Sequence, residues 1–261
     1  MKARTELFLY QLLWTAEMAT QPTFRNLSGS FEGWAYRNGF LRQVRELERK
    51  NILESAKNPH STERVFRLTQ SGRRLARGGR DPEALWSRPW DGKWRMVVFD
   101  LPESQRSLRQ SLRRALRAAH LGCLQQSVWI TPDPLDPATD LIRPLKVDAG
   151  SLVFFEGLPC GGENDADLAF KAWDFSMINR QYAQYTEHLQ RFATVKKQAS
   201  PDKLLAWLTE ERNLWMGCLS TDPLLPNVLL PQGYAGQKAW DHRRTTLAKF
   251  AQYAKSLTSK V

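Results

Sequence analysis

The chain combines an ordinary globular composition with an unusual excess of positive charge. It has 261 residues, 42% of them hydrophobic and 25% charged, and its formal net charge at pH 7 is +11. This composition is typical of a soluble globular protein of one to three domains, and no apolar run approaches the ~18 residues that a membrane span needs. The charge favours a polyanionic partner, nucleic acid first and an acidic membrane surface second. A merely basic soluble protein is the alternative.

At the N-terminus, residues 4–18 predict a helix that is apolar on most sides and therefore central to a small bundle. Lys2 and Arg4 precede its apolar run LFLYQLLWTA, which gives it some likeness to a short signal peptide. Glu6 and Gln11 interrupt that run, and no small-residue cleavage site follows. We therefore expect a cytoplasmic protein with a buried first helix.

The next segments predict a winged helix-turn-helix. A short second helix precedes EGWAYRNGFLRQVRELERKNILES, in which Val44 and Leu47 belong to an apolar stripe at helical spacing. NILES then leads out as a strand, Asn58-Pro59 signals a turn, and RVFRLT is a second strand. Thr69 is placed to cap a closing helix, QSGRRLA.

This N-terminal part carries most of the positive charge. Residues 1–90 contain 16 Lys+Arg and 9 Asp+Glu, a net charge of +7. A recognition helix enters the major groove with its N-terminal half, where Arg suits guanine and Asn suits adenine. The alternative is a solvated helix face on which Glu46 and Glu48 pair with the arginines. The expected DNA contacts are Tyr36, Arg37, Asn38 and Arg42 at base edges or nearby phosphates, and Arg45, Arg49, Lys57 and Arg64 at phosphates.

The middle of the chain predicts a ferredoxin-like unit. Residues 77–89 mix Gly, Pro and charge and resemble a linker with one helical turn. WRMVVF is a continuous apolar strand, which is typical of a strand covered on both faces. A helix rich in arginine follows to about His120, then two short strands in LGCLQQSVWITP, a helical DPLDPATDLIRPL and a last strand in SLVFFEG. This order is β-α-β-β-α-β.

Asp100 ends the first strand of this unit and raises a catalytic alternative. The arrangement resembles the small CRISPR adaptation nuclease-like subunit, in which paired chains place two such carboxylates around a metal. Phosphodiester cleavage assisted by a metal needs two or three converging oxygen ligands. Only Glu103 lies nearby in the sequence, so we expect Asp100 to cap the following helix or to pair with an arginine. A metal-dependent nuclease using Asp100 stays as an alternative function.

Cysteine and histidine usage gives no support for a metal or disulfide framework. The three cysteines and four histidines are scattered, so we expect a reducing compartment, no metal site and no cofactor. They are Cys123, Cys160, Cys218, His60, His120, His188 and His242.

The last third predicts helices. One long helix is expected from about residue 166, with a broad aromatic face that belongs to a core. A second begins at a Ser200 cap with Pro201 in its first turn. A proline-rich crossing and a final helix over QKAWDHRRTTLAKFAQYAKSL follow. The predicted fold class is α+β, with a winged helix-turn-helix over residues 1–80, a linker and ferredoxin-like domain over 81–160, and a helical domain over 161–261.

Several motifs resemble the PaaX-type transcriptional repressors, named for control of phenylacetic acid degradation. They are WDGKWRMVVFDLPESQRSLRQSLRRAL, SVWITP, AWDF, the Tyr-rich helix after it, and DPLLPNVLLPQGYAGQKA. The resemblance covers nearly the whole chain and implies a homodimer that binds a palindromic DNA operator and is released by an acyl-CoA, typically phenylacetyl-CoA. The segment YRNGFLRQVRELERKNIL departs from the usual surface sequence, which implies a different operator, and no effector-binding residue carries over.

From these patterns and the resemblance we expect a ligand-responsive, dimeric repressor that binds double-stranded DNA and no membrane. The small-molecule effector is an aryl- or acyl-CoA such as phenylacetyl-CoA. The alternatives are the Asp100 nuclease and an architectural DNA binder without an effector. The large C-terminal domain disfavours the second, because plain DNA binding does not require it.

Overall fold

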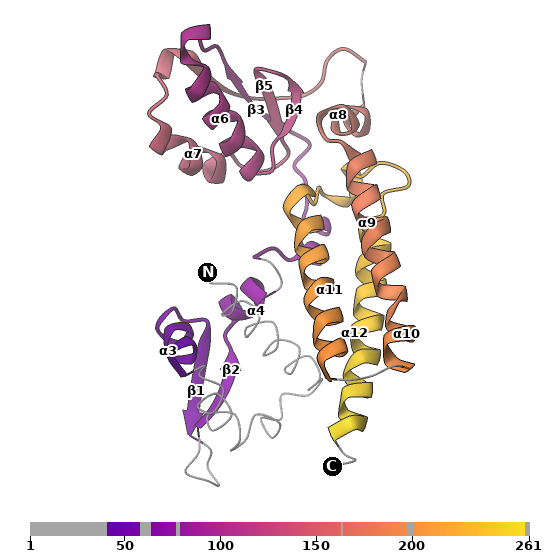
Figure 1. Ribbon diagram of the computed structural model, residues 1–261. Helices are drawn as coiled ribbons and strands as arrows, with labels where there is room; N and C mark the ends of the chain where they lie inside the picture. Colours follow the sequence, from indigo (N-terminus) through magenta and orange to yellow (C-terminus); the bar gives the residue numbers. More distant parts are fainter. Residues whose placement is uncertain (1–40, 58–63, 77–78, 163, 198–200, 259–261) are drawn as a thin grey trace. The chain divides into compact units, whose positions relative to one another are not determined.

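The structure is a computed structural model, and it describes residues 41–57, 64–76, 79–162, 164–197 and 201–258 (Figure 1). The chain divides into two compact units. One contains residues 1–81, 185–216 and 238–261, and the other contains residues 82–184 and 217–237. Helices and two small sheets occur together, so the predicted α+β class is confirmed. None of the described helices is both long and apolar enough to cross a membrane.

In the first unit, the described N-terminal part has the hairpin and closing helix that the sequence predicts. The two strands pair antiparallel, with Leu53 opposite Leu68 and Ser55 opposite Phe66. The two predicted helices before them lie outside the described residues, as does the turn at residues 58–63. The elements are α3 (Leu41–Arg49), β1 (Leu53–Lys57), β2 (Arg64–Leu68) and α4 (Gln70–Ala76).

The start of α4 is held against the end of α3. The backbone N–H of Gly72 donates to Thr69 Oγ1 at 2.9 Å, which confirms the predicted cap. Thr69 Oγ1 in turn donates to the carbonyl of Asn51 at 2.7 Å. A Cβ at Gly72 would lie 2.0 Å from the carbonyl oxygen of Ile52, so this close approach requires glycine.

The second unit contains the sheet that the ferredoxin-like prediction requires. Its strand order is β4-β5-β3-β6 and every neighbouring pair is antiparallel. With one helix after the first strand and one after the third, this is the ferredoxin-like arrangement. The predicted linker contains the short helix α5 at the place where the sequence predicts one helical turn. The elements are α5 (Pro82–Trp86), β3 (Trp94–Phe99), η2 (Glu103–Gln105), α6 (Arg106–Ala118), β4 (Gly122–Gln125), β5 (Val128–Thr131), α7 (Asp136–Ile142), η3 (Arg143–Leu145), η4 (Ala149–Ser151) and β6 (Leu152–Gly157).

Helices α6 and α7 cover one face of this sheet (Figure 1). Val97 and Trp129 pack there against Leu112 of α6 and Ile142 of α7, and all four are buried. Side chains alternate along a strand, so Met96 and Val98 point to the other face.

That second face is only partly covered, so the expectation that β3 is buried on both sides is wrong. Val98 is half-buried, and its β6 partner Val153 is 45% exposed. An apolar run in the sequence indicates that its side chains favour burial. It does not show whether a helix or another strand covers both faces of the sheet.

The C-terminal helices differ from the sequence prediction, because the one long helix expected is divided at Trp173 and again between Gln190 and Phe192. The single long helix expected from residue 166 is interrupted at Trp173, which has extended backbone angles (φ −124°, ψ 141°). Asp174 caps the next helix, because its Oδ1 accepts the backbone N–H of Met177 at 2.8 Å. The interruption lets the Trp173 ring pack against Gly122, where a Cβ would lie 2.6 Å away. The elements are α8 (Asp165–Ala172), α9 (Phe175–Gln190), α10 (Phe192–Lys197), α11 (Pro201–Thr221), η5 (Asn227–Leu229) and α12 (Gly236–Thr258).

Candidate DNA-binding surface and apolar pocket

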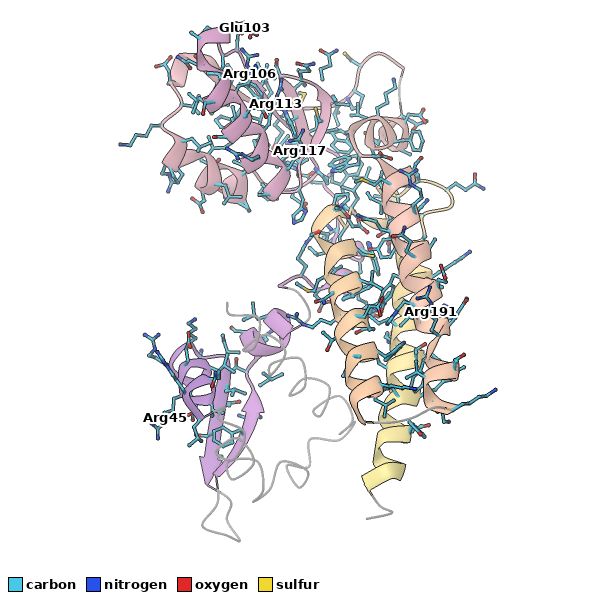
Figure 2. The ribbon with its side chains drawn as sticks, viewed as in Figure 1. Arg45, Glu103, Arg106, Arg113, Arg117 and Arg191 are labelled. Atoms are coloured by element: carbon cyan, nitrogen blue, oxygen red, sulfur yellow. The ribbon has the colours of Figure 1, made fainter. Side chains whose placement is uncertain are left out.

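Helix α3 presents a basic face opposite its buried one. Val44 and Leu47 are buried, whereas Arg42, Arg45 and Arg49 are exposed on the other side (Arg45 is labelled in Figure 2). This is the division that the helical periodicity of the sequence predicts.

The α3 arginines are available to an outside partner. Among the described residues, Arg42, Arg45 and Arg49 form no ion pair, and Glu46 on the same helix pairs with Lys50 at 2.9 Å. The hydrogen bond from Lys50 holds the pKa of Glu46 below its ordinary value. Three guanidinium groups within nine residues of helix therefore form a site of positive charge suited to phosphate or to base edges.

The structure describes only two of the other predicted DNA contacts, Lys57 and Arg64. Tyr36, Arg37 and Asn38 lie outside the described residues. Lys57 ends β1 and Arg64 begins β2, so their backbones lie at the same end of the hairpin and face each other in its register. The hairpin therefore brings these two basic residues together at its tip.

Asp100 and Glu103 do not converge on a common site. Asp100 is exposed after β3, and its backbone N–H donates to the carbonyl of Ser151 at 3.0 Å. Glu103 pairs with Arg109 at 2.8 Å. Within the described ranges, Asp100 neither caps a helix nor pairs with an arginine, so that expectation is wrong: Glu103 takes the arginine. The described residues contain no group of three His, Cys, Asp or Glu side chains that could hold a metal ion.

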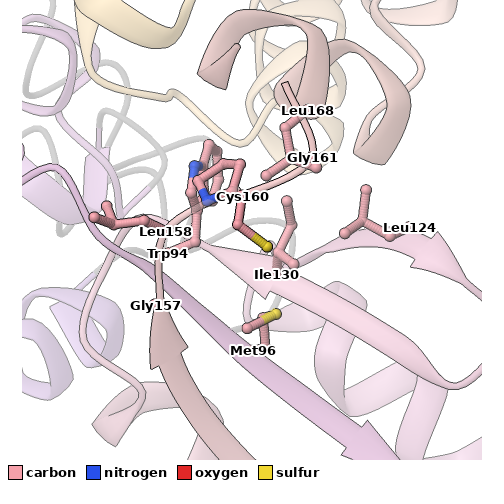
Figure 3. A pocket seen from close by; sticks show the side chains of 10 residues that line it. Trp94, Met96, Leu124, Ile130, Gly157, Leu158, Cys160, Gly161 and Leu168 are labelled. Carbon is pink, nitrogen blue, oxygen red and sulfur yellow. The ribbon is translucent and has the colours of Figure 1, made fainter. Parts of the chain in front are cut away.

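An apolar pocket lies on the sheet face opposite α6 and α7 (Figure 3). Its volume is about 200 Å³. Strands β3, β4 and β5 supply its floor, and the segment after β6 and helix α8 supply its walls. Figure 3 shows the Cys160 side chain pointing toward Ile130. The lining residues are Trp94, Met96, Leu124, Ile130, Gly157, Leu158, Pro159, Cys160, Gly161 and Leu168.

The three thiols differ in accessibility, which makes Cys160 chemically distinct. Cys160 is exposed, Cys123 is half-buried and Cys218 is buried. Burial raises the pKa of Cys123 above its ordinary value, and burial together with the charge of Asp222 raises the pKa of Cys218 to about 12. Because the thiolate is the reactive form, Cys160 should react first with an alkylating reagent.

A buried polar network in the second unit was not foreseen from the sequence. Tyr182 Oη donates to Asp222 Oδ2 at 2.6 Å, and Tyr234 Oη donates to the same oxygen. Trp86 Nε1 donates to Tyr234 Oη at 3.1 Å, so the network also holds α5. Burial, and then the charge of Asp222, raises the pKa of both tyrosines. Both hydroxyls therefore stay protonated as donors.

The first unit contains a buried ion pair of the same kind. Arg243 Nε of α12 donates to Glu211 Oε1 of α11 at 2.9 Å, and Tyr185 Oη of α9 donates to the same oxygen at 2.7 Å. The Arg243 guanidinium lies 5.1 Å from the ring centroid of Trp215. No local motif marks Tyr185, Glu211 and Arg243 as partners, because these three residues come from three different helices.

Comparison with known proteins bears on the middle and C-terminal parts of this architecture. Residues 87–169 match the family described as PaaX protein central Cas2-like domain, and residues 173–260 match the PaaX-like protein C-terminal domain. The two matches together cover more than half of the chain. The chain belongs to the PaaX-like family. The resemblance to PaaX-type proteins predicted from the sequence is thereby confirmed, and the chain is a regulator of the PaaX type.

Solved structures similar to this PaaX-like chain include one that covers most of its length. It is the uncharacterized protein Rv0674 from Mycobacterium tuberculosis, with 20% identity over 84% of this chain and 83% of that chain, and a TM-score of 0.49. No curated protein sequence matches the chain significantly.

Proposed function

We propose that this PaaX-like protein is a cytoplasmic, dimeric transcriptional repressor that leaves its DNA operator when it binds a small-molecule effector. The observation that carries the proposal is the row of arginines on the solvent side of α3, without an ion pair in the described chain and followed directly by a hairpin. Residues 1–80 act as the winged helix-turn-helix, 81–160 as linker and ferredoxin-like domain, and 161–261 as the helical domain.

In this proposal α3 is the C-terminal part of the recognition helix. The N-terminal half of such a helix contacts base edges, and its later turns meet the backbone. Arg42 then lies nearest the bases, together with Tyr36, Arg37 and Asn38. Arg45 and Arg49 lie one and two turns further on and contact phosphates, as do Lys57 and Arg64 on the wing.

The exposed apolar strand β6 supports the dimer. Strand β6 is at the edge of the sheet, and three consecutive apolar residues in it are exposed. Val153, Phe154 and Phe155 are 45%, 42% and 52% exposed. A flat apolar edge is a liability for a monomer and is normally covered. A second copy of this strand is the occupant that a repressor with two half-sites requires.

Replacing Phe155 by Asp is expected to separate the dimer. A carboxylate on this apolar face would be desolvated on association, which is strongly unfavourable. Sedimentation velocity should show the parent as a dimer and the variant as a monomer at the same concentration. Phe170→Asp, on the exposed face of α8, is the matched control and should stay dimeric. A variant that sediments like the parent would remove β6 from the interface.

The apolar pocket supports a ligand with an aromatic or branched apolar end. A dry cavity of about 150 Å³ lined by aliphatic side chains can bind benzene, and the volume here is about 200 Å³. An aryl- or acyl-CoA such as phenylacetyl-CoA has an apolar group of this size. We therefore assign its acyl end to this pocket.

Saturating phenylacetyl-CoA is expected to slow alkylation of Cys160 by iodoacetamide several-fold, because the acyl group would cover the thiol. Peptide mass spectrometry would give the rate at each cysteine, and Cys123, which does not line the pocket, serves as the internal control. Leu124→Trp should fill the pocket and abolish the protection. Leu141→Trp, on the exposed face of α7, should not. Equal Cys160 rates with and without the CoA ester would exclude this pocket as its site.

The first experiment is a gel-shift titration of the purified protein on fragments of its own promoter region. Magnesium is present, and phenylacetyl-CoA is added or omitted. A specific shift reversed by the CoA ester supports both repressor and effector class. A specific shift indifferent to it keeps the regulator and directs the search to other acyl-CoAs. Binding without sequence preference would favour the architectural alternative, and cut DNA would favour the Asp100 nuclease.

A further inference from the structure

Helix α6 carries a concentration of arginine that DNA reading by α3 does not use. Its 13 residues, RSLRQSLRRALRA, include five arginines and no acidic residue. Residues 81–160 contain ten basic and ten acidic residues, so this region has no net charge although half of its basic residues lie on one helix. General solubility does not require such segregation. The arginines are Arg106, Arg109, Arg113, Arg114 and Arg117, and Figure 2 labels three of them along α6.

Four of these five guanidinium groups have no ionic partner within the described chain. Only Arg109 does, in Glu103, and it also donates to the carbonyl of Leu101 at 2.8 Å. The other four are here named the α6 arginine row. Like charges three and four residues apart on a helix repel by roughly 0.2–0.5 kcal/mol per pair. An external anion would relieve that repulsion. The row consists of Arg106, Arg113, Arg114 and Arg117.

Neighbouring groups hold part of the row in place. Arg113 Nη2 donates to Gln126 Oε1 at 3.1 Å, and the Arg117 guanidinium lies 5.4 Å from the ring centroid of Trp129. Arg114 Nη2 donates to Ser111 Oγ at 3.0 Å. These neutral partners orient the side chains without neutralising them. Binding of a ligand there therefore costs less arginine side-chain entropy than binding to freely rotating side chains would.

The spacing and residue type suit a nucleic-acid backbone. From Arg106 to Arg117 the helix rises about 16 Å, and a DNA strand carries one phosphate per ~3.4 Å of axis. The row can therefore meet several phosphates at once. It consists only of arginine, which binds phosphate bidentately. An acidic membrane surface fits less well, because the apolar residues Leu112 and Leu116 of α6 are fully buried and leave no apolar face for the lipid.

We propose that the α6 arginine row binds the phosphate backbone of double-stranded DNA outside the bases that α3 reads. The contact is independent of sequence and adds affinity and salt dependence to operator binding. This inference rests on the proposed function and extends it to a second surface of the same protein.

The test uses the full chain with Arg106, Arg113 and Arg117 each changed to Gln. Fluorescence anisotropy gives the operator affinity between about 50 and 200 mM salt, on a duplex with long flanks. The slope of log affinity against log salt should become shallower by about 2–3, and affinity at the low-salt end should fall about tenfold or more. Preference for operator over scrambled DNA should be unchanged, because the row touches no bases.

Two further variants separate a lost contact from a damaged fold. Arg106→Gln with Arg114→Gln leaves the packed Arg113 and Arg117 in place and should make the slope shallower by about 2. Arg143→Gln is the control, since Arg143 is exposed in the same unit but paired with Asp140 at 3.1 Å. Its slope should equal that of the parent.

The outcomes distinguish this inference from the proposed function. A parent without sequence preference would refute the operator-binding function itself. A parent that binds its operator specifically, with both arginine variants keeping its slope and affinity, would overturn the α6 contact alone. Variants that lost binding to phosphatidylserine vesicles but kept the DNA slope would also overturn it, and would assign the row to a lipid surface.

Discussion

Replacing Arg243 by Met is expected to destabilise the C-terminal helices by about 3–5 kcal/mol, because it removes the guanidinium that is hydrogen-bonded to the buried carboxylate of Glu211. Glu211 is 0% exposed and Arg243 is 3% exposed, so water cannot replace the lost partner. Tyr185 Oη would remain as a hydrogen-bond donor to Glu211 but carries no charge. The midpoint of urea unfolding, followed by far-UV circular dichroism, measures the effect.

The destabilisation should grow with pH. Burial raises the pKa of Glu211 above its ordinary value even though Arg243 opposes that shift, so removal of Arg243 should raise it further. An acid whose pKa is higher in the folded state binds its proton more tightly there. Its contribution to stability is fully present below the unfolded pKa and is lost as pH rises through the folded pKa. The Arg243→Met variant should therefore lose more stability at about pH 8 than at about pH 5.

Two comparisons make this result specific to the ion pair. Lys249→Met removes an exposed charge from the same helix and should leave the midpoint close to that of the parent. Combining Arg243→Met with Glu211→Leu removes both charges and should recover much of the lost stability, since an apolar pair can replace a buried ion pair. A single variant that unfolds like the Lys249→Met control at both pH values would contradict the pairing of Glu211 with Arg243.

Replacing Arg42 by Ala is expected to weaken specific operator binding about 5–150-fold, the equivalent of roughly 1–3 kcal/mol for a lost contact to a base. Its side chain is exposed and forms no ion pair among the described residues, so thermal stability should not change. Arg45→Ala should instead weaken binding to all sequences alike and make the salt slope shallower by about 1, as for a phosphate contact.

Gel-shift titrations on operator and scrambled DNA separate these two outcomes. Arg191→Ala is the matched control, because Arg191 is exposed on the protein but paired with Glu187 at 2.7 Å. Its affinity for either DNA should equal that of the parent. Equal operator affinity for Arg42→Ala and the parent would count against α3 as the recognition helix.

Local elements were predictable where a repeating pattern or a cap marks them. The apolar spacing of Val44 and Leu47 predicts the buried side of α3, and Thr69 predicts the start of α4. The helix break at Trp173 was missed, because an aspartate within an aromatic helical pattern also suits a solvated face. Its role as a cap became visible only from the hydrogen bond to Met177.

The candidate site divides in the same way. The basic face of α3 follows from helical periodicity alone. With 3.6 residues per turn, its three arginines fall on the side opposite the two buried residues. The pocket could not be predicted from periodicity, because its lining residues come from separate strands and a loop. Examples are Met96, Leu124, Ile130 and Cys160. Periodicity also does not predict which α6 arginines have no ionic partner among the described residues, because that depends on the ion pair between Glu103 and Arg109.

The sequence by itself determined most of the order of helices and strands that the structure describes, although not the division of the long helix after residue 166. It also determined where the positive charge lies along the chain and, through its motifs, the PaaX-like family. The order of elements and the position of the charge depend on residue types and their spacing along the chain, whereas the family follows from the resemblance of its motifs. The tertiary structure decided which buried charges became partners, as with Glu211 and Arg243, 32 positions apart. It also decided that one face of the sheet stays partly open. Periodicity records that a side chain prefers burial, whereas its partner is set by how distant segments cross in space.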